Sequence, residues 1–299
     1  MAEKCVLYFS GGTMAGVFGA GVGAGLIERN FDDHVEAIYG GSAGAFNAAY
    51  FLTRQNSIGP SIYYEDLVEY FILARNIPFG VFQRFCLRYF GIYPGKLRQA
   101  VNIDLLMDIV ANKKILDLEK LKKSPNPIYV KVRDVKNKKW AFIDLRTYHN
   151  PLQLLKASVS VVPYFLSSEN IDNLECIDHC LADPLTLDFI VARHPDSKIV
   201  FVVNYVEKMR LLRPVAMFLE GVVANWCFPE LERTCFIKGM KKFEQDVKRI
   251  KKDPNMLLIT PPEHVSITGY ETDPVKLIKI YEAGKVEANK IVDFLRDRV

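Results

Sequence analysis

Short, fully apolar runs alternate along the chain with longer segments whose apolar residues recur at helical spacing. The runs at 5–10 and 35–40 have the length of a strand, and each leads into glycine and then into a helical pattern. Further apolar runs occur at 198–206 and 256–262. Because such strands are typical of a parallel sheet covered by helices, this order predicts a three-layer α/β/α fold with a mostly parallel central sheet.

Glycine is unusually frequent in the helical segment 14–28, which reads MAGVFGAGVGAGLIE. Each interior glycine costs a helix up to about 1 kcal/mol relative to alanine. So many of them predict that another element packs very close to this helix backbone.

One domain spanning residues 1–299 is the simplest interpretation, because no repeat or low-complexity linker divides the chain. Residues 127–135 and 138–145 read as a strand hairpin within it. We expect three parts, which are the core motifs at 5–187, a helical insertion or cap at about 61–125, and C-terminal strands and helices at 198–299.

Composition and charge narrow the function classes. The chain has 299 residues, of which 49% are apolar and 25% charged, and its net charge is only +4. This excess is too weak to argue for nucleic acid as a partner. Neither a signal peptide nor a run of about 18 apolar residues occurs, so we expect a cytoplasmic protein whose contact with lipid is peripheral.

Six scattered cysteines make no CxxC pair. Cys176 and Cys180 flank Asp178 and His179, but this spacing does not match zinc sites and a second ligand pair is missing. Buried, reduced thiols are the better interpretation, and we expect no metal.

Residues 40–44 read Gly-Gly-Ser-Ala-Gly, directly after a predicted strand and before a predicted helix. This is the context of a nucleophile elbow, in which Ser42 is held at a sharp turn with its hydroxyl exposed. Gly40 and Gly44 are small because chain and helix approach closely there. A tight structural turn is the alternative.

Residues 10–16, Ser-Gly-Gly-Thr-Met-Ala-Gly, form a glycine-rich loop at the end of the first strand. Such a loop can direct backbone N–H groups at an anion, which in acyl transfer is the tetrahedral oxygen. A Walker phosphate loop is excluded, because no Lys-Ser or Lys-Thr follows. The G-x-G-x-x-A pattern at Gly19, Gly21 and Ala24 lies inside a helix, so the dinucleotide interpretation fails as well.

These two segments resemble the patatin-like phospholipase family, in which a glycine-rich anion loop follows the first strand and a G-x-S-x-G elbow follows the next. Gly11, Gly12 and Gly16 match the family's S-G-G-G-x-R-G segment. Thr13 replaces its third glycine, and Ala15 replaces its arginine.

Two later segments extend the resemblance over roughly the first two thirds of the chain. Residues 157–165, ASVSVVPYF, are similar to the family's A-S-x-x-x-P-x-x-F stretch. Residues 176–187 are similar to the block that carries the catalytic aspartate, D-G-[GA], which falls on Asp178, and Pro184 matches a proline six residues later.

The resemblance implies a lipid acyl hydrolase, of phospholipase A or lysophospholipase type, with a Ser–Asp dyad and no cofactor. Ser42 would attack the acyl carbonyl, and Asp178 would accept its proton. The N–H groups near Gly11, Gly12 and Thr13 would hold the oxyanion. Lipid or phospholipid is then the expected partner.

The predicted base departs from the family pattern, since Asp178 is followed by His179 and Cys180 in place of small residues. This departure bears on rate and substrate range more than on chemical class. A free aspartate has a pKa near 3.9. Burial against Ile177, Cys180 and Leu181 would raise that pKa and make proton transfer from serine easier.

A Ser-acid-His triad is the rival arrangement. The chain order of an α/β-hydrolase allows His194 or His264 as the base. Neither lies in a recognisable context, so a surface or hydrogen-bonded histidine is favoured for each.

Two segments bear on contact with lipid. Residues 77–95 are rich in aromatics, and Phe82, Phe85, Cys86 and Tyr89 share one helical face. This face is either an interfacial lid or acyl-chain groove, or a surface packed on the core, which the pattern favours. The basic helix at 238–252 could approach anionic headgroups, although a solvated face is its ordinary interpretation.

Three function classes are therefore weighed. The first is the lipid acyl hydrolase. The second is a lipid-binding or regulatory protein of the same fold that has lost turnover, since Thr13, Ala15, His179 and Cys180 depart from the pattern. The third, an unrelated nucleotide-binding protein, is disfavoured by the missing phosphate-loop lysine.

Overall fold

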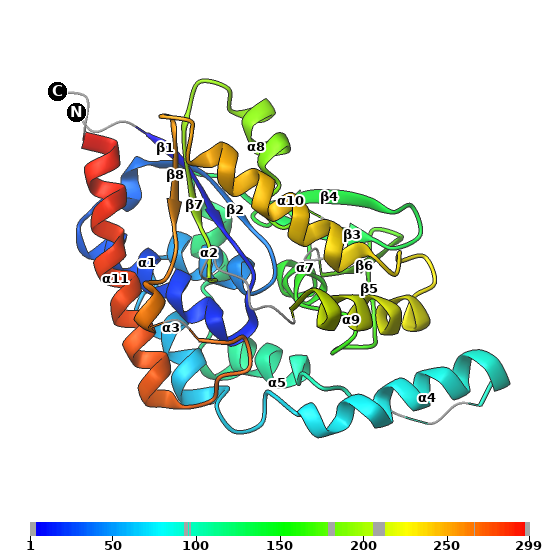
Figure 1. The fold of residues 1–299 in the computed structure, drawn as a ribbon. Helices are drawn as coiled ribbons and strands as arrows, with labels where there is room; N and C mark the ends of the chain where they lie inside the picture. Colours follow the sequence, from blue (N-terminus) through cyan, green and yellow to red (C-terminus); the bar gives the residue numbers. More distant parts are fainter. Residues whose placement is uncertain are drawn as a thin grey trace.

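The computed structural model describes residues 4–92, 95, 97–178, 183–205, 213–265 and 267–296. The described residues build an eight-stranded sheet, in which β3, β2, β1, β7 and β8 run parallel in that order (Figure 1). The mostly parallel sheet predicted from the sequence is confirmed. The strands are β1 Cys5–Phe9, β2 Val35–Gly40, β3 Ile128–Asp134, β4 Lys139–Asp144, β5 Glu169–Ile171, β6 Leu174–Ile177, β7 Lys198–Val202 and β8 Met256–Ile259.

The strand β3 has two unequal edges. The antiparallel strand β4 occupies one edge over its whole length. The other edge is shared by two strands, since β2 ends with Gly40 opposite Val130 and the antiparallel β6 ends with Ile177 opposite Arg133. The two strands therefore approach each other end to end, and two residues of β3, a span of about 10 Å, lie between their ends.

Helices cover both faces of the sheet, which confirms the three-layer α/β/α prediction (Figure 1). α1, α2, α7 and α11 pack on one face, and α8 and α10 pack on the other. The α-helices are α1 Val17–Glu28, α2 Ala43–Leu52, α3 Ile58–Ser61, α4 Ile77–Phe90, α5 Ile103–Asp108, α6 Leu118–Lys123, α7 Pro151–Ser158, α8 Leu187–Arg193, α9 Arg213–Cys227, α10 Cys235–Ile250 and α11 Pro274–Arg296. The 3-10 helices are η1 Thr13–Gly16, η2 Asp32–His34, η4 Ala74–Asn76 and η6 Glu263–Val265. The π-helices are η3 Ile62–Asp66 and η5 Ile109–Lys113.

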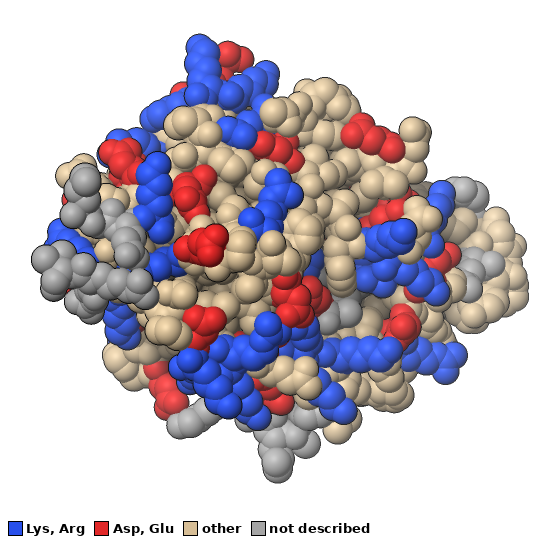
Figure 2. Space-filling view, turned by 90° about the horizontal axis from the view of Figure 1, so that it is seen from above, with Lys and Arg blue, Asp and Glu red and all other residues tan. Residues whose placement is uncertain are grey.

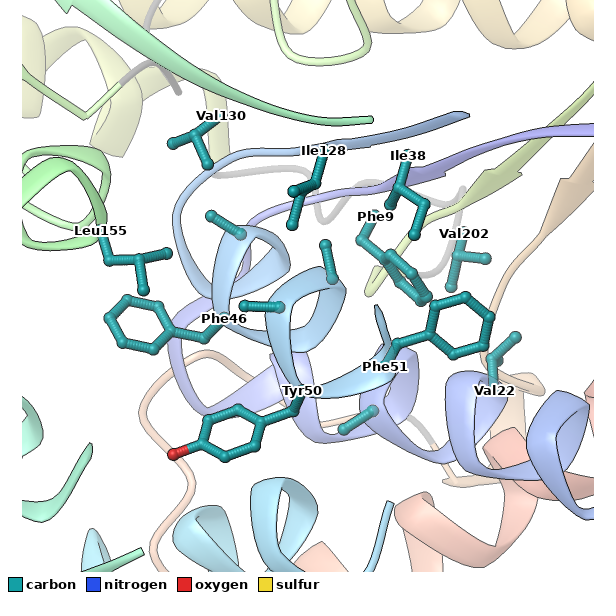
Figure 3. Close-up of a cluster of buried hydrophobic side chains, with 14 of the residues drawn as sticks. Phe9, Val22, Ile38, Phe46, Tyr50, Phe51, Ile128, Val130, Leu155 and Val202 are labelled. Atoms are coloured by element: carbon teal, nitrogen blue, oxygen red, sulfur yellow. The ribbon is translucent and has the colours of Figure 1, made fainter. Parts of the chain in front are cut away.

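The larger core lies between the sheet and α2 (Figure 3). Alternate residues of the strands face it, such as Phe9 of β1 and Ile38 of β2, and Phe46 and Phe51 of α2 meet them. The rings of Phe9 and Phe51 lie 6.0 Å apart. Burial of these side chains fixes α2, and with it the turn that precedes α2.

The glycine-rich helix α1 packs backbone to backbone against α11. A Cβ atom at Gly21 would lie 2.1 Å from the carbonyl oxygen of Tyr281, and one at Gly284 would lie 2.3 Å from that of Phe18. No larger residue fits at this distance. The close neighbour predicted from the glycines is therefore α11, the last helix of the described chain.

The expected insertion at about 61–125 contains η3, α4, α5, η5 and α6. α4 reaches away from the sheet at the lower right of Figure 1 and packs against α9. Phe82 is 65% exposed and Tyr89 is 57% exposed. The favoured prediction that this face packs on the core is wrong for these two rings, because nothing in the described chain covers that side of α4.

Charged side chains of both signs are interspersed on the face seen from above (Figure 2). The basic helix α10 packs Val247 and Ile250 on the sheet. Its Lys242 and Arg249 both pair with Asp188, at 2.7 Å and 2.5 Å. These pairs favour the solvated-face interpretation of this helix. Of the helices that the structure describes, none has the length and apolarity needed to cross a bilayer.

Candidate active site

The glycine loop and the elbow lie side by side at the carboxyl edge of the parallel strands. β1 and β2 pair with Phe9 opposite Gly40, so the loop at 10–16 and the elbow at 40–44 leave neighbouring strands at the same level. Open parallel sheets bind ligands at this edge. The structure therefore brings together two segments that are separate in the sequence.

Ser42 occupies the sharp turn between β2 and α2. Its backbone has φ 56° and ψ −135°, which an L-residue adopts only when its surroundings enforce it. The side chain does not cap the helix that follows. A Cβ atom at Gly44 would lie 2.1 Å from the carbonyl oxygen of Phe9, and one at Gly40 would lie 2.7 Å from that of Gly44. Gly44 is therefore required by the close approach of β1 and α2, and Gly40 by that of β2 and α2.

The loop after β1 leaves three successive N–H groups without a partner. Within the described chain, the backbone N–H groups of Gly11, Gly12 and Thr13 donate no hydrogen bond. Gly12 has φ 153° and Thr13 has φ 52°. The loop runs into η1 and α1, so the positive end of a helix lies beside these donors. Such a cluster of free donors suits an anion.

Asn204 fixes the shape of this loop, and the sequence analysis did not single it out. Its Nδ2 donates to the carbonyl oxygens of Ser10 and Gly11, at 2.7 Å and 3.0 Å. Its Oδ1 accepts from the N–H of Gly19 at 2.9 Å. Because Asn204 is only 2% exposed and holds these two carbonyls, it sets the direction of the peptide groups that follow.

A C-terminal segment also braces the loop. The N–H of Met14 donates to the carbonyl oxygen of Gly269 at 3.2 Å. A Cβ atom at Gly269 would lie 3.0 Å from the carbonyl oxygen of Gly12. The next residue, Tyr270, stacks edge-on against Tyr164 with ring centroids 5.7 Å apart. The end of the chain therefore contributes to the site, although no motif marks it in the sequence.

Asp178 directly follows β6. When the registers of β2 and β6 are continued past their ends, Ser42 and Asp178 both come to the level of Val132, on the same edge of β3. The N–H of Asp178 donates to the carbonyl oxygen of Ser160 at 3.1 Å. The aspartate is 2% exposed. The two strands thus end toward each other, with the two predicted dyad residues next along the same edge of β3.

Three residues that the sequence places beside the predicted base lie outside the described chain, namely His179, Cys180 and Leu181. Ile177, the fourth, is fully buried. The chain resumes at Asp183, where Lys131 of β3 donates from Nζ to the carbonyl oxygen of Asp183 and to Oγ1 of Thr186, both at 2.6 Å. This buried lysine anchors the segment that follows the predicted base.

An apolar pocket opens beside Ser42. Thr13 lines it together with Ser42, and Val159 and Val161 line it from the stretch after α7. The expected insertion supplies much of the remaining wall, which includes Ile62, Tyr63, Leu67, Phe71, Val101 and Leu106. The alternative prediction of an acyl-chain groove along 77–95 is not confirmed, because the groove residues lie before and after that segment.

The polar groups in the pocket wall bind one another. Tyr63 donates from its hydroxyl to Oδ1 of Asn47 at 3.0 Å, and Asn47 donates from Nδ2 to the carbonyl oxygen of Gly16 at 2.7 Å. Burial raises the pKa of Tyr63, so it stays neutral. With its polar atoms paired, this wall presents carbon to the cavity and suits a hydrocarbon chain.

The described histidines are not positioned for a triad. His194 lies before β7, at the amino edge of the sheet, and its Nε2 is 2.9 Å from the hydroxyl of Tyr39. Burial lowers its pKa. His264 is exposed and follows β8, three strands from β2. His149 is exposed beside Asp172. These positions disfavour His194 and His264 as the base of a triad.

The described cysteines are free thiols. Burial raises the pKa of Cys5 and of Cys176 to about 12, which keeps both protonated. Within the described chain, no three side chains of the metal-binding types gather in one place. Cys180 lies outside that part of the chain.

Comparisons with known proteins agree with this geometry. Residues 7–187 match the family model described as patatin-like phospholipase. The fold is similar to the crystal structure of VipD from Legionella pneumophila, with a TM-score of 0.50 and 13% identity over 98% of this chain and 67% of that one. At this identity the likeness concerns the fold alone.

A short sequence match covers only a small part of each protein. It joins the chain to eukaryotic translation initiation factor 2 subunit 1 of Plasmodium falciparum, with 33% identity over 87 residues. These residues are 29% of this chain and only 26% of that protein. The match spans about a quarter of that relative, so it assigns no family.

Proposed function

The chain belongs to the patatin-like phospholipase family, a family of lipid acyl hydrolases, and from this premise we propose that it cleaves fatty-acyl esters through a Ser42–Asp178 dyad. Ser42 serves as the nucleophile and Asp178 as its base. The N–H groups of Gly11, Gly12 and Thr13 form the oxyanion hole. No metal or cofactor takes part in these steps.

The chemistry follows the usual course of acyl transfer. The Oγ of Ser42 attacks the ester carbonyl carbon, and Asp178 takes the hydroxyl proton. The carbonyl oxygen becomes an oxyanion, which the free N–H groups stabilise, and one such donor is worth roughly 3–4 kcal/mol of barrier. The intermediate collapses, and the leaving alkoxide takes the proton from Asp178. Water then hydrolyses the acyl-serine and releases the fatty acid.

One observation carries the proposal. Ser42 stands at φ 56° in a strained turn and lines an apolar pocket. A strained backbone persists only where the surrounding structure enforces it, and it concentrates at functional sites. A serine held in this way beside a hydrocarbon-lined pocket supports attack on the carbonyl of a long acyl chain.

The pocket supports substrates with an apolar chain, and we propose phospholipids or lysophospholipids. Such substrates reside in membranes or micelles, so peripheral contact with a lipid surface belongs to the same proposal.

The test is ester hydrolysis by the wild type and by Ser42→Ala, Asp178→Asn and His264→Ala. A medium-chain p-nitrophenyl ester and a phospholipid serve as substrates. We expect kcat to fall by about a thousandfold or more in the two dyad variants, because each removes a group that reacts. His264→Ala is the control and should retain activity. Full activity of Asp178→Asn would contradict the dyad.

A second candidate, a lipid-binding protein without turnover, is favoured by Thr13. This β-branched residue stands at φ 52°, where the family has glycine. Labelling with a fluorophosphonate probe separates the candidates, because only an activated serine reacts. Labelling of the wild type that is lost in Ser42→Ala supports the hydrolase. Absence of labelling in a folded wild type supports the binding protein.

A further inference from the structure

Residues 74–99 include an arm, described at 74–92, 95 and 97–99, that projects from the body of the molecule. The arm contains η4 and α4, and its residues 97–99 lead into Ala100. At its root, the N–H of Leu73 donates to the carbonyl oxygen of Ala100 at 2.7 Å, and Ile72 bridges to Val101. α4 extends from this root to the right of the molecule (Figure 1).

The outer face of α4 is apolar and open to solvent. Its exposed aromatics are Phe79 at 55%, Phe82 at 65%, Tyr89 at 57% and Phe90 at 66%. At 100° per residue these four rings fall within an arc of about 100°, so they share one face of the helix. The opposite face carries Gly80, whose Cβ position would lie 2.2 Å from the carbonyl oxygen of Arg98.

α9 presents a second stripe of the same kind. Val215, Phe218, Leu219 and Trp226 are between 43% and 61% exposed and follow helical spacing. The buried residues Gly221, Ala224 and Cys227 hold the other side of the helix against the protein.

Phe85 joins the two stripes. Its ring lies 5.9 Å from that of Trp226 on α9, and 4.7 Å and 5.9 Å from those of Tyr89 and Phe90 on α4. The two helices therefore share one apolar surface, which we call the α4–α9 face. Continuous exposed apolar surfaces of this kind mark interaction sites.

The charge of the arm indicates which kind of surface binds the α4–α9 face. Residues 74–99 contain five basic side chains and no acidic one, and the basic residues are Arg75, Arg84, Arg88, Lys96 and Arg98. On α10, by contrast, basic side chains pair with acidic ones. A second copy of the chain would bring two positive arms together, which is unfavourable. An anionic surface complements both the charge and the apolar rings.

The arm is also connected to the acyl pocket. Phe71 and Val101, which flank its root, both line the cavity beside Ser42. The N–H of Asn102 donates to the carbonyl oxygen of Phe71 at 2.8 Å, so the two sides of the root are fixed to each other. A lipid surface bound by the arm therefore lies near the residues at its root that line the pocket.

We propose that the α4–α9 face docks on an anionic lipid bilayer and thereby presents the pocket to membrane lipid. The second half of this proposal rests on the proposed function, whereas the docking itself does not. Rings of Phe and Trp enter the interface between headgroups and acyl chains, and the exposed Arg75 and Arg98 bind the headgroup phosphates.

Vesicle binding by Ser42→Ala protein tests the docking without hydrolysis. The vesicles contain phosphatidylcholine alone or with phosphatidylserine. We expect binding to the anionic vesicles that salt weakens. Phe82→Ser with Phe90→Ser should weaken binding by about tenfold or more, because two apolar rings no longer enter the bilayer. Arg75→Glu with Arg98→Glu should weaken it as well.

The matched control is Val275→Ser with Val286→Ser, two exposed apolar residues of α11 at 74% and 62%. This control should bind as the parent does. Equal loss in the control, absence of vesicle binding, or a dimer in light scattering that only the Phe variants dissociate would each overturn the proposal. Hydrolysis of a soluble p-nitrophenyl ester by Phe82→Ser with Phe90→Ser should be unchanged, which separates failure of docking from failure of the proposed function.

Discussion

Ser42 and Thr13 hold backbone conformations that L-amino acids rarely adopt, with φ of 56° and 52°. Each such residue costs of order 1–3 kcal/mol and persists only when neighbouring groups enforce it. At Thr13 the neighbours are Asn204, which binds the preceding carbonyls, and Gly269, which accepts from Met14. At the scale of residues, the candidate site thus depends on side chains that need not touch a substrate.

Asn204→Asp tests this dependence. The Asp side chain can still accept from Gly19, but it places an oxygen against the carbonyl oxygens of Ser10 and Gly11 in place of the Nδ2 donor. The loop should then lose its present direction. We expect kcat for ester hydrolysis to fall by about 10- to 100-fold, with a smaller change in KM, since the pocket is intact.

Asn289→Asp is the control for this substitution, because it makes the same chemical change on an exposed partner of Arg29. It should leave kcat unchanged. If Asn204→Asp raised KM and left kcat intact, the asparagine would act on the pocket and not on the loop.

At the scale of elements, two close contacts shape the molecule. One is the end-to-end approach of β2 and β6 along a single edge of β3, the edge on which Ser42 and Asp178 follow these strands. The other is the glycine contact between α1 and α11, which joins the start of the described chain to its end. Both contacts depend on how closely two backbones approach each other, more than on any side chain.

Two alanine substitutions in α1 separate packing from helix propensity. Gly21→Ala places a Cβ atom 2.1 Å from a backbone carbonyl of α11, so the helices must move apart. We expect a loss of about 3 kcal/mol or more in the free energy of unfolding. Gly23→Ala meets no backbone atom and contacts only the side chains of Phe51, at 3.3 Å, and of Phe9, at 3.6 Å. Its gain in helix propensity, up to about 1 kcal/mol, should offset that contact.

Urea denaturation measures both variants. Equal stability losses would mean that the glycines matter for reasons other than the α11 contact.

At the scale of the whole molecule, the two faces of the sheet differ in the contacts that they make. The face covered by α2 carries the pocket that Ser42 lines. The opposite face, covered by α8 and α10, holds aromatic and ionic contacts, among them Tyr39 with His194. A titratable group on that face therefore bears on stability and not on the proposed chemistry.

The unfolding free energy should depend on pH through His194. Burial lowers its pKa below the ordinary 6.5, helped by the nearby charge of Arg193 and opposed by Glu36. The unfolded chain then binds more protons, so this contribution is complete above pH 6.5 and is lost as the pH falls from there through the folded pKa. We expect His194→Gln to be less sensitive to acid than the wild type between pH 7.5 and 5.5, as measured by urea denaturation. An identical slope in both proteins would exclude His194 as the source.

The sequence predicted the parallel core well because apolar runs and glycine turns are local signals. The hairpin of β3 and β4 and the strands β1 and β2 lie where the patterns place them. The hairpin of β5 and β6 was not predicted, although Asp172 and Asn173 have the positive φ of a tight turn and could have marked it. The end of β6 positions Asp178. The hairpin with the weakest sequence pattern therefore determines where the predicted base lies.

By itself the sequence determined the class of fold, the elbow at Ser42 and the glycine loop at 11–13, because each follows from the order of residues within about one strand and one helix. Only the tertiary structure decided what surrounds them. The pocket wall from the insertion, the hold of Asn204 and Gly269 on the loop, and the outward turn of the α4 aromatics are contacts between residues far apart in the chain. Such contacts depend on how elements pack in space, and no local pattern encodes them.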